Sequence, residues 1–185
     1  MPKDNVRERI GITREELVRI ELDILDRRHI ERYALVRQWL YGVVLDCACG
    51  VGYGTYLSSL NPDVTSIIGV DKDADAIEHA KKEFGGDKIK YHCLDATAFS
   101  VPCDTFLCIE TLEHLREPKQ MADLAKRCGA KQVIVSYPSK KTTHYNPHHF
   151  WDFKQEQVED IFNEYELSEA VDLWHEIKVL RFFAK

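Results

Sequence analysis

The sequence predicts an α/β fold in which a doubly wound, mostly parallel sheet of seven strands is covered by helices. Short apolar segments alternate along the chain with segments of helical periodicity, which is the pattern of successive strand–helix units. The apolar segments are nearly continuous, as is typical of parallel strands buried on both faces. The strands are expected at residues 43–46, 66–71, 89–94, 105–109, 132–136, 170–174 and 179–184.

Helices are expected between these strands. Their signals are apolar residues at helical spacing, an aspartate at the N-cap and glycines at the end. The expected helices are residues 13–40 in two segments, with Leu17, Ile20 and Ile24 on one face; a helix capped by Asp73, with Ile77, Ala80 and Phe84 on one face, closed by Gly85-Gly86; residues 118–128; and a helix with Val158, Ile161, Phe162 and Tyr165 on one side.

Length and composition predict one globular domain over residues 1–185, with a helical N-terminal segment (1–40) and an α/β core (41–185). Of the 185 residues, 44% are hydrophobic and 30% are charged, so the chain can bury a full core. No run approaches the roughly 20 apolar residues of a membrane span, and the charged N-terminus does not resemble a signal peptide. The six cysteines form no CxxC metal pair, and several fall in apolar runs. A reducing cytoplasm is therefore expected.

The charge of the chain bears on its partners. The formal net charge is −6 and the pI is about 5.8. Proteins that grip long nucleic acids usually carry a basic field, because neutralising phosphates supplies most of that affinity. The sequence therefore disfavours a nucleic-acid substrate, although a local basic patch would still permit one, and it leaves monomer and homodimer equally open.

Four successive strands end at an acidic residue: Asp46, Asp71, Asp95 and Glu110. In a doubly wound sheet, ligands bind outside the carboxyl ends of the strands. Four carboxylates there would disfavour a phosphate-rich ligand. They suit a ligand with ribose hydroxyls, an adenine amine and a cationic ammonium and sulfonium, and S-adenosylmethionine is such a ligand.

The turn after the first strand spaces its glycines, Gly50, Gly52 and Gly54, as GxGxG. The dinucleotide fingerprint GxGxxG would need a glycine where Thr55 stands, so the turn favours S-adenosylmethionine over NAD. Glycines let the backbone approach the ligand closely. Asp71 follows about 20 residues later, the distance at which a carboxylate reaches ribose hydroxyls.

The segment from Val44 to Gly54 resembles the first motif of the class I S-adenosylmethionine-dependent methyltransferases, and the resemblance extends over nearly the whole chain. It implies a Rossmann-like fold with an antiparallel last strand and S-adenosylhomocysteine as a product. The cofactor-binding residues that it implies are Asp46, Ala48, Gly50 and Gly52 in the turn, Asp71 with Lys72 at the ribose, Asp95 with Ala96 at the adenine, Glu110 along the cofactor, and Tyr33 from the upstream stretch His29–Tyr33.

Two later segments resemble parts of this family that act on the acceptor. Glu110–Leu115 resembles the ExxEH segment of sugar, lipid and ubiquinone-type methyltransferases, and 146–153 resembles the NPxHxxEF loop of bacterial and phage relatives, with Asp152 in place of glutamate. The catalytic residues implied are His114, Glu113 and His149, with His148 as an additional histidine. Either His114 or His149 could take a proton from an acceptor hydroxyl near neutral pH, while alignment of acceptor and methyl group supplies further acceleration.

The same residues allow a second chemistry. Glu110, Glu113, His114 and His149 could hold a divalent ion, and the imidazoles would favour Mn, Fe, Co or Zn over Mg. This set resembles the 2′-O-methyltransferases that act at the 3′ ends of small RNAs. The chain has no added RNA-binding domain and is acidic, so the main prediction assigns no metal.

We therefore predict methyl transfer from S-adenosylmethionine to an oxygen or nitrogen acceptor, either a small molecule or a glycan. Three rivals are less favoured. A dehydrogenase or epimerase would carry a different glycine spacing and a YxxxK-like pair. A non-catalytic cofactor-binding module would not need the ExxEH and NPxH segments. A DNA base methyltransferase would carry NPPY or DPPY where Ile109–Leu112 stands.

Overall fold

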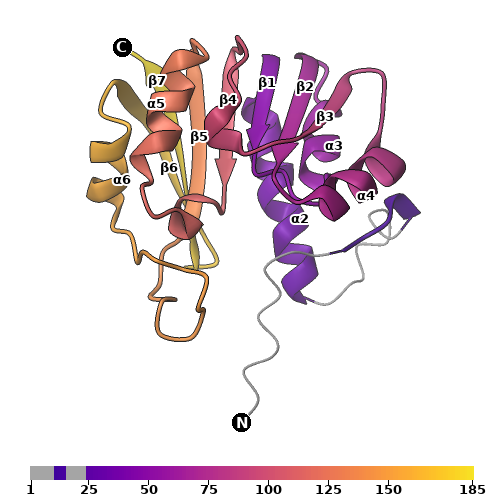
Figure 1. The fold of residues 1–185 in the computed structure, drawn as a ribbon. Coiled ribbons are helices and arrows are strands. Elements are labelled where there is room, and N and C mark those ends of the chain that lie inside the picture. Colours follow the sequence, from indigo (N-terminus) through magenta and orange to yellow (C-terminus); the bar gives the residue numbers. More distant parts are fainter. Residues whose placement is uncertain (1–10, 16–23) are drawn as a thin grey trace.

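The computed structural model describes residues 11–15 and 24–185, and a single seven-stranded sheet forms its centre (Figure 1). The strand order is β3-β2-β1-β4-β5-β7-β6. All neighbours pair in parallel except β7, which is antiparallel to both β5 and β6. The predicted fold class and the antiparallel last strand are thus confirmed. The strands are β1 (Gly42–Cys47), β2 (Val64–Asp71), β3 (Ile89–Cys93), β4 (Thr105–Ile109), β5 (Gln132–Pro138), β6 (Tyr165–Leu173) and β7 (Ile177–Ala184).

The strand order reverses between β1 and β4. From β1 the chain proceeds outward to β2 and β3, then returns to place β4 on the other side of β1. The carboxyl ends of these parallel strands share one edge of the sheet, where a doubly wound fold binds ligands. The start of α2 (Ile24–Val36) and the loop that leaves β5 lie at this same lower edge in Figure 1.

Helices cover both faces of the sheet and divide its core into two clusters. One cluster packs α2, α3 (Tyr53–Ser59) and α4 (Ala74–Phe84) against one face. The other packs α5 (Lys119–Arg127) and α6 (Gln155–Ile161) against the opposite face. Three short 3₁₀ helices complete the order of elements: η1 (Arg37–Trp39), η2 (Ala96–Ala98) and η3 (Leu112–His114).

The α4 helix forms as its sequence predicts. The Asp73 side chain accepts hydrogen bonds from the backbone N–H groups of Asp75 and Ala76, at 3.0 and 3.2 Å, which caps the first turn. Ile77, Ala80 and Phe84 are buried on the face toward the sheet. Gly85 follows as the C-cap.

Two elements differ from the sequence prediction. The α3 helix was not predicted, because at seven residues it is too short to show a helical period, and its start at Gly52 needs a left-handed backbone with φ of 89°. The α6 helix ends at Ile161, so Tyr165 does not share its face but begins β6, which starts five residues before the predicted 170. The sequence signal failed because Tyr165 follows Ile161 by four residues, as in a helix. In addition, β6 is an edge strand whose residues alternate between more and less buried positions instead of forming an apolar run.

Part of the predicted N-terminal helix cannot be compared with the structure. Leu17 and Ile20 lie outside the described residues, and Ile24 begins α2 without a described side chain. Within the described residues, no helix has both the length and the apolar character that crossing a bilayer requires. All six cysteines are free, and all but Cys93 are buried.

Candidate active site

The glycine turn after β1 is held in place by Asp71 at the end of β2. Ala48, Gly50 and Gly52 all have positive φ angles, so the backbone curls back at the carboxyl edge of the sheet. The N–H of Gly50 donates to Asp71 Oδ2 at 2.9 Å, and the N–H of Asp73 donates to Oδ1 at 3.0 Å. Asp71 therefore fixes the turn as well as facing the cavity beside it.

Asp46, beneath this turn, and Gly52, within it, do not line the cavity beside the turn, and their role as cofactor contacts stays a prediction. Asp46 is fully buried and accepts a 2.7 Å hydrogen bond from Thr55 Oγ1. Burial raises its pKa to about 7; the Thr55 hydrogen bond opposes this rise and the charge of Asp71 adds to it. A Cβ at Gly52 would meet Ala80 at 2.6 Å, so the glycine serves helix packing.

A cavity of about 690 Å³ opens over the turn, within the usual size of cofactor sites. Its walls come from α2, the turn, the ends of β2 and β3, and the segment after β4. The predicted cofactor residues that line it are Tyr33, Ala48, Gly50, Asp71, Lys72, Asp95, Ala96 and Glu110.

A second cavity of about 340 Å³ borders the first. Its walls include residues of the β6–β7 turn, among them Trp174, and residues of the loop at residues 139–154, among them Tyr145. Four residues line both cavities: His29, Arg32, Glu110 and His114. A group bound in one cavity would therefore lie next to a group bound in the other.

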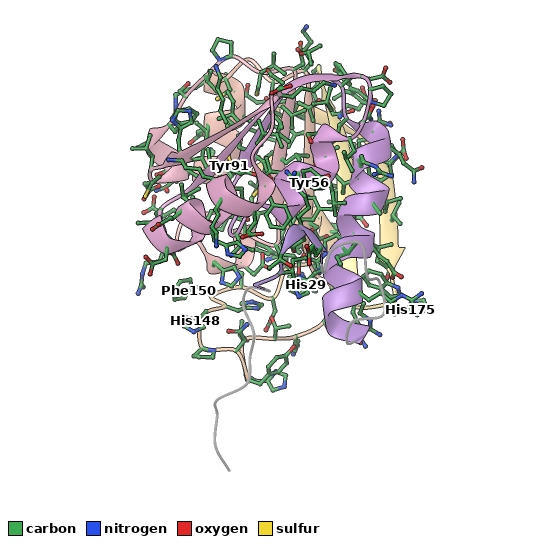
Figure 2. The ribbon with its side chains drawn as sticks, turned by 90° about the vertical axis from the view of Figure 1, so that its right-hand side faces the viewer. His29, Tyr56, Tyr91, His148, Phe150 and His175 are labelled. Carbon is green, nitrogen blue, oxygen red and sulfur yellow. The ribbon has the colours of Figure 1, made fainter. Side chains whose placement is uncertain are left out.

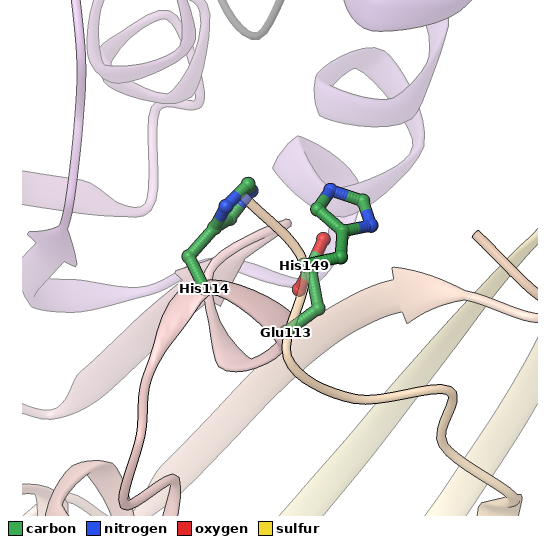
Figure 3. Close-up of side chains that lie close together, drawn as sticks. All are labelled: Glu113, His114 and His149. Atoms are coloured by element: carbon green, nitrogen blue, oxygen red, sulfur yellow. The ribbon is translucent and has the colours of Figure 1, made fainter. Parts of the chain in front are cut away.

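Glu113, His114 and His149 come together beside the second cavity (Figure 3). The first two belong to η3 and the third to the loop at 139–154. One ligand-type atom from each lies within 4.8 Å of the others, and the two imidazole rings meet edge to face at 4.6 Å. Glu113 is only 1% exposed. The structure thus brings together the three predicted catalytic residues.

Glu110 stands apart from this group, although the alternative metal set inferred from the sequence included it with Glu113, His114 and His149. Its backbone has a φ of 49°, and η3 begins two residues later. Its Oε1 accepts from Ser136 Oγ at 2.7 Å, and its Oε2 lies 3.7 Å from Arg32 Nη2.

Hydrogen bonds seat the 139–154 loop on η3. The N–H of Phe150 donates to the Glu113 carbonyl at 2.7 Å, and His114 Nδ1 donates to the His148 carbonyl at 3.2 Å. His149 Nδ1 lies 2.7 Å from the hydroxyl of Thr142. The positions of both histidine rings are therefore set by this one docked loop.

Asp152 organises the start of the same loop. It accepts hydrogen bonds from the N–H groups of Thr142 and Thr143 at 2.7 and 3.1 Å, and from the Thr143 hydroxyl at 2.6 Å. Burial alone would raise the pKa of this carboxyl, but these hydrogen bonds outweigh burial and bring the pKa down to about 2. Asp152 thus holds the start of the loop in place through these hydrogen bonds.

Comparison with solved structures identifies the architecture. Magnesium protoporphyrin IX methyltransferase (ChlM) from Synechocystis PCC 6803, with bound S-adenosylhomocysteine, aligns with a TM-score of 0.71 over 89% of each chain at 18% identity. The N-methyltransferase NodS from Bradyrhizobium japonicum WM9, also with S-adenosylhomocysteine, aligns with a TM-score of 0.69 over 90% of each chain at 18% identity. This chain has the class I methyltransferase fold.

The comparisons of sequence match a smaller part of the chain than the comparisons of structure. The family described as "Methyltransferase domain" matches residues 44–131, a little under half of the chain. No curated protein matches the sequence. Another structure with this methyltransferase fold is the [4+2]-cyclase SpnF, with a TM-score of 0.71 over 85% of this chain and 82% of that one at 14% identity. The fold alone therefore does not fix the reaction.

Several residues of the site escaped the sequence prediction. His29 and Arg32 line both cavities. Helical spacing on α2 would have placed His29, four residues before the predicted Tyr33, on the same face, but it does not point to Arg32, the adjacent residue. His148, predicted as an additional histidine, lines the larger cavity together with Phe150. His29, His148 and Phe150 all lie at the lower edge of the molecule in Figure 2. No sequence signal predicts where the residues of the 139–154 loop lie, because the loop is positioned by contacts with segments distant in sequence.

Proposed function

We propose that this chain transfers a methyl group from S-adenosylmethionine to an oxygen or nitrogen acceptor, either a small molecule or a glycan. The observation that carries the proposal is the pair of bordering cavities with His114 in the wall of both. The larger cavity has the glycine turn and carboxylates that suit the cofactor. The smaller cavity gives an acceptor access to the same histidine.

The residues of the larger cavity fit S-adenosylmethionine. Asp71 and Asp95 lie at the ends of β2 and β3, where carboxylates can accept hydrogen bonds from ribose hydroxyls and an adenine amine. Ala48 and Gly50, which both have positive φ angles in the turn, line the same cavity and can offer backbone atoms to the ligand. Bound there, the cofactor supplies a methyl group already activated by a positively charged sulfur.

The acceptor side is served by His114 and His149. A histidine can take the acceptor's proton near neutral pH, and the docked loop holds both rings beside the second cavity. The walls of that cavity hold the acceptor next to the cofactor, and such alignment contributes a large share of the acceleration in transfer reactions.

The test uses S-adenosylmethionine labelled on its methyl group, incubated with the protein and a cell extract. We expect label in a small-molecule or glycan pool, and a loss of turnover of about 10²-fold or more in His114→Ala or His149→Ala without loss of cofactor binding. His144→Ala is the control, since His144 lines neither cavity. Full activity in both histidine variants would contradict their catalytic role. Cofactor binding without label in any pool would favour a non-catalytic binding module.

A second candidate is a divalent-metal-dependent methyltransferase that acts on the 2′-hydroxyl of RNA. The observation that favours it is the Glu113, His114 and His149 group, whose ligand-type atoms lie within 4.8 Å of one another. Two imidazoles and a carboxylate would favour Mn, Fe, Co or Zn over Mg. Glu110, named as a fourth ligand from the sequence, is not in this group.

The metal candidate makes its own predictions. Adding a chelator to the labelling reaction should abolish transfer, and label should enter RNA. Direct titration with Mn²⁺, Co²⁺ or Zn²⁺ should show one site that His149→Ala weakens and His144→Ala leaves unchanged. Transfer that survives the chelator, in a protein that binds none of these ions, would exclude the metal candidate while leaving the first proposal intact.

A further inference from the structure

The turn between β6 and β7 holds two bulky residues in a backbone conformation that suits glycine. Trp174 and His175 both have a φ of 55°, and the N–H of Glu176 donates to the Leu173 carbonyl at 3.0 Å, which closes the turn. Glycine and asparagine adopt this left-handed conformation at low cost, whereas a bulky side chain there strains the backbone. Strain of this kind clusters at functional sites, where a side chain must be held in one position.

Of these two residues, Trp174 is the one that borders a cavity. It lines the second cavity, whereas His175 lines neither cavity and its side chain is 94% exposed. The Trp174 ring lies against α2, with the Arg28 guanidinium 5.5 Å from the ring centroid. Arg28 also pairs with Glu176, whose carbonyl accepts from the N–H of Ser139 at 2.8 Å. The turn is therefore tied both to α2 and to the loop that follows β5, which fixes the indole in the cavity wall.

The lysine and arginine charges of the second cavity are balanced by acids of the same cavity. Among the described residues that line it, Arg28 and Lys140 both pair with Glu176, and Arg32 pairs with Glu110. Binding a polyanion requires cations that are free to neutralise its phosphates. The paired charges therefore favour an uncharged polar ligand over a nucleic acid.

The rest of the cavity wall combines polar groups with aromatic rings. Thr142 and Asn146 contribute a hydroxyl and an amide, and Tyr145 adds a second ring that is 57% exposed. Pro138 and Ile177 are the aliphatic residues of this wall among those described. A lipid tail needs a predominantly apolar lining. A sugar ring instead presents hydroxyls at its rim for polar side chains and C–H bonds on its faces for an aromatic ring.

We propose that the acceptor is a saccharide and that Trp174 binds one of its rings, with the indole face against the C–H face of the sugar. The inference rests on the proposed methyl transfer and names the acceptor class of that site. His114 lines both cavities, so a sugar held in the second cavity borders the cofactor site. A sugar hydroxyl oxygen forms a bond to the methyl carbon as the carbon–sulfur bond breaks, its proton passes to His114 or His149, and S-adenosylhomocysteine is released.

The probe is the saccharide fraction of the cell extract, separated from RNA, lipids and aromatic small molecules, together with methyl-labelled S-adenosylmethionine. Acid hydrolysis of the product should release the label as a methylated monosaccharide. In Trp174→Gly, the amount of this fraction that half-saturates the rate should rise by about 10-fold or more, the scale of a lost aromatic contact, with a smaller change in the maximal rate. Trp174→Tyr keeps a ring and should retain most of the wild-type behaviour.

His175→Gly is the matched control, because it places glycine at the neighbouring position of the same turn, where φ is also 55°. Removing the backbone strain there should raise the melting temperature by about 2–4 °C and leave the labelling rate unchanged. Calorimetric titration with S-adenosylhomocysteine shows whether Trp174→Gly is folded, and its affinity should equal that of wild type. Trp174→Asn, which also suits a left-handed backbone, takes its place if Trp174→Gly does not fold.

The outcomes separate this inference from the proposed function. The same half-saturating amount in Trp174→Gly and wild type would overturn the role of Trp174, and so would an equal loss in His175→Gly, which would assign the effect to the turn. Label that enters an aromatic small molecule, a lipid or RNA of the whole extract, but no saccharide, would overturn the acceptor class while leaving methyl transfer established. Cofactor binding without label in any pool would overturn the proposed function together with this inference.

Discussion

At the scale of single residues, Asp71 combines two tasks that sequence spacing cannot separate. It lines the larger cavity, and its two oxygens accept from the N–H groups of Gly50 and Asp73. A change at this residue therefore alters both the ligand contact and the shape of the turn.

We expect Asp71→Ala to weaken binding of S-adenosylhomocysteine by about 1–3 kcal/mol, the scale of a lost hydrogen bond to a charged group. Calorimetric titration measures this difference. Asp87→Ala, an exposed aspartate before β3, should leave the affinity unchanged. An unaltered affinity in Asp71→Ala would remove the ribose assignment.

Asp46 gives a prediction for stability against pH. Its folded pKa is raised to about 7 from 3.8, chiefly by burial. Between these values the unfolded chain releases the proton while the folded chain keeps it, so rising pH favours the unfolded state. Stability should fall between about pH 4 and pH 7 and level off above that range.

The variant Asp46→Asn keeps an oxygen for Thr55 Oγ1 and cannot ionise. The difference in unfolding free energy between Asp46→Asn and wild type should grow on the order of 1 kcal/mol per pH unit across that window. Urea unfolding at several pH values measures it. Parallel curves for the two proteins would show that the Asp46 carboxyl titrates normally.

At the scale of elements, the 139–154 loop contributes His149, which lies beside His114 of η3. It is anchored at Asp152 within the loop and at η3 through the carbonyl of Glu113. Removing one anchor should loosen the loop without unfolding the sheet, because its hydrogen bonds lie outside the two core clusters.

In Asp152→Ala, the amides of Thr142 and Thr143 lose their carboxylate acceptor. We expect their hydrogen exchange to accelerate by about 10- to 100-fold, the scale of a hydrogen bond to a charged group, and turnover to fall while cofactor affinity is kept. Asp160→Ala on α6 should change neither. Protection that persists in Asp152→Ala would mean that the docking on η3 alone holds the loop.

At the scale of the whole molecule, ligand binding should stabilise the chain by mass action. At about one hundred times the dissociation constant, S-adenosylhomocysteine should add about 2.7 kcal/mol to the free energy of unfolding. The gain in hydrogen-exchange protection should concentrate at the carboxyl edge of the sheet. Stabilisation spread evenly over both faces would argue against a single site at that edge.

The net charge of −6 gives a second expectation at this scale. Affinity for unstructured RNA should be weak at physiological salt, because few phosphates can be neutralised. A filter-binding titration over several salt concentrations measures this, with tight, strongly salt-dependent binding as the result that would revive the RNA candidate.

The sequence by itself determined the strands, the glycine turn and the capped α4 helix, because local signals encode these features. Apolar runs of strand length specify buried strands, Asp73 and Gly85 bound a helix, and acids at successive strand ends converge once the strands are parallel. The cavity at the carboxyl edge therefore contains most of the residues predicted for it.

Only the tertiary structure decided which side chains meet. Asp46 is fully buried beneath the turn. Glu110 pairs with Arg32 and accepts a hydrogen bond from Ser136, and it does not lie in the group formed by Glu113 and the two histidines. His149 reaches His114 through a loop whose docking depends on hydrogen bonds across more than 30 residues of chain. Periodicity reports the face on which a residue lies, but contacts between distant segments follow from packing and charge balance in the folded molecule.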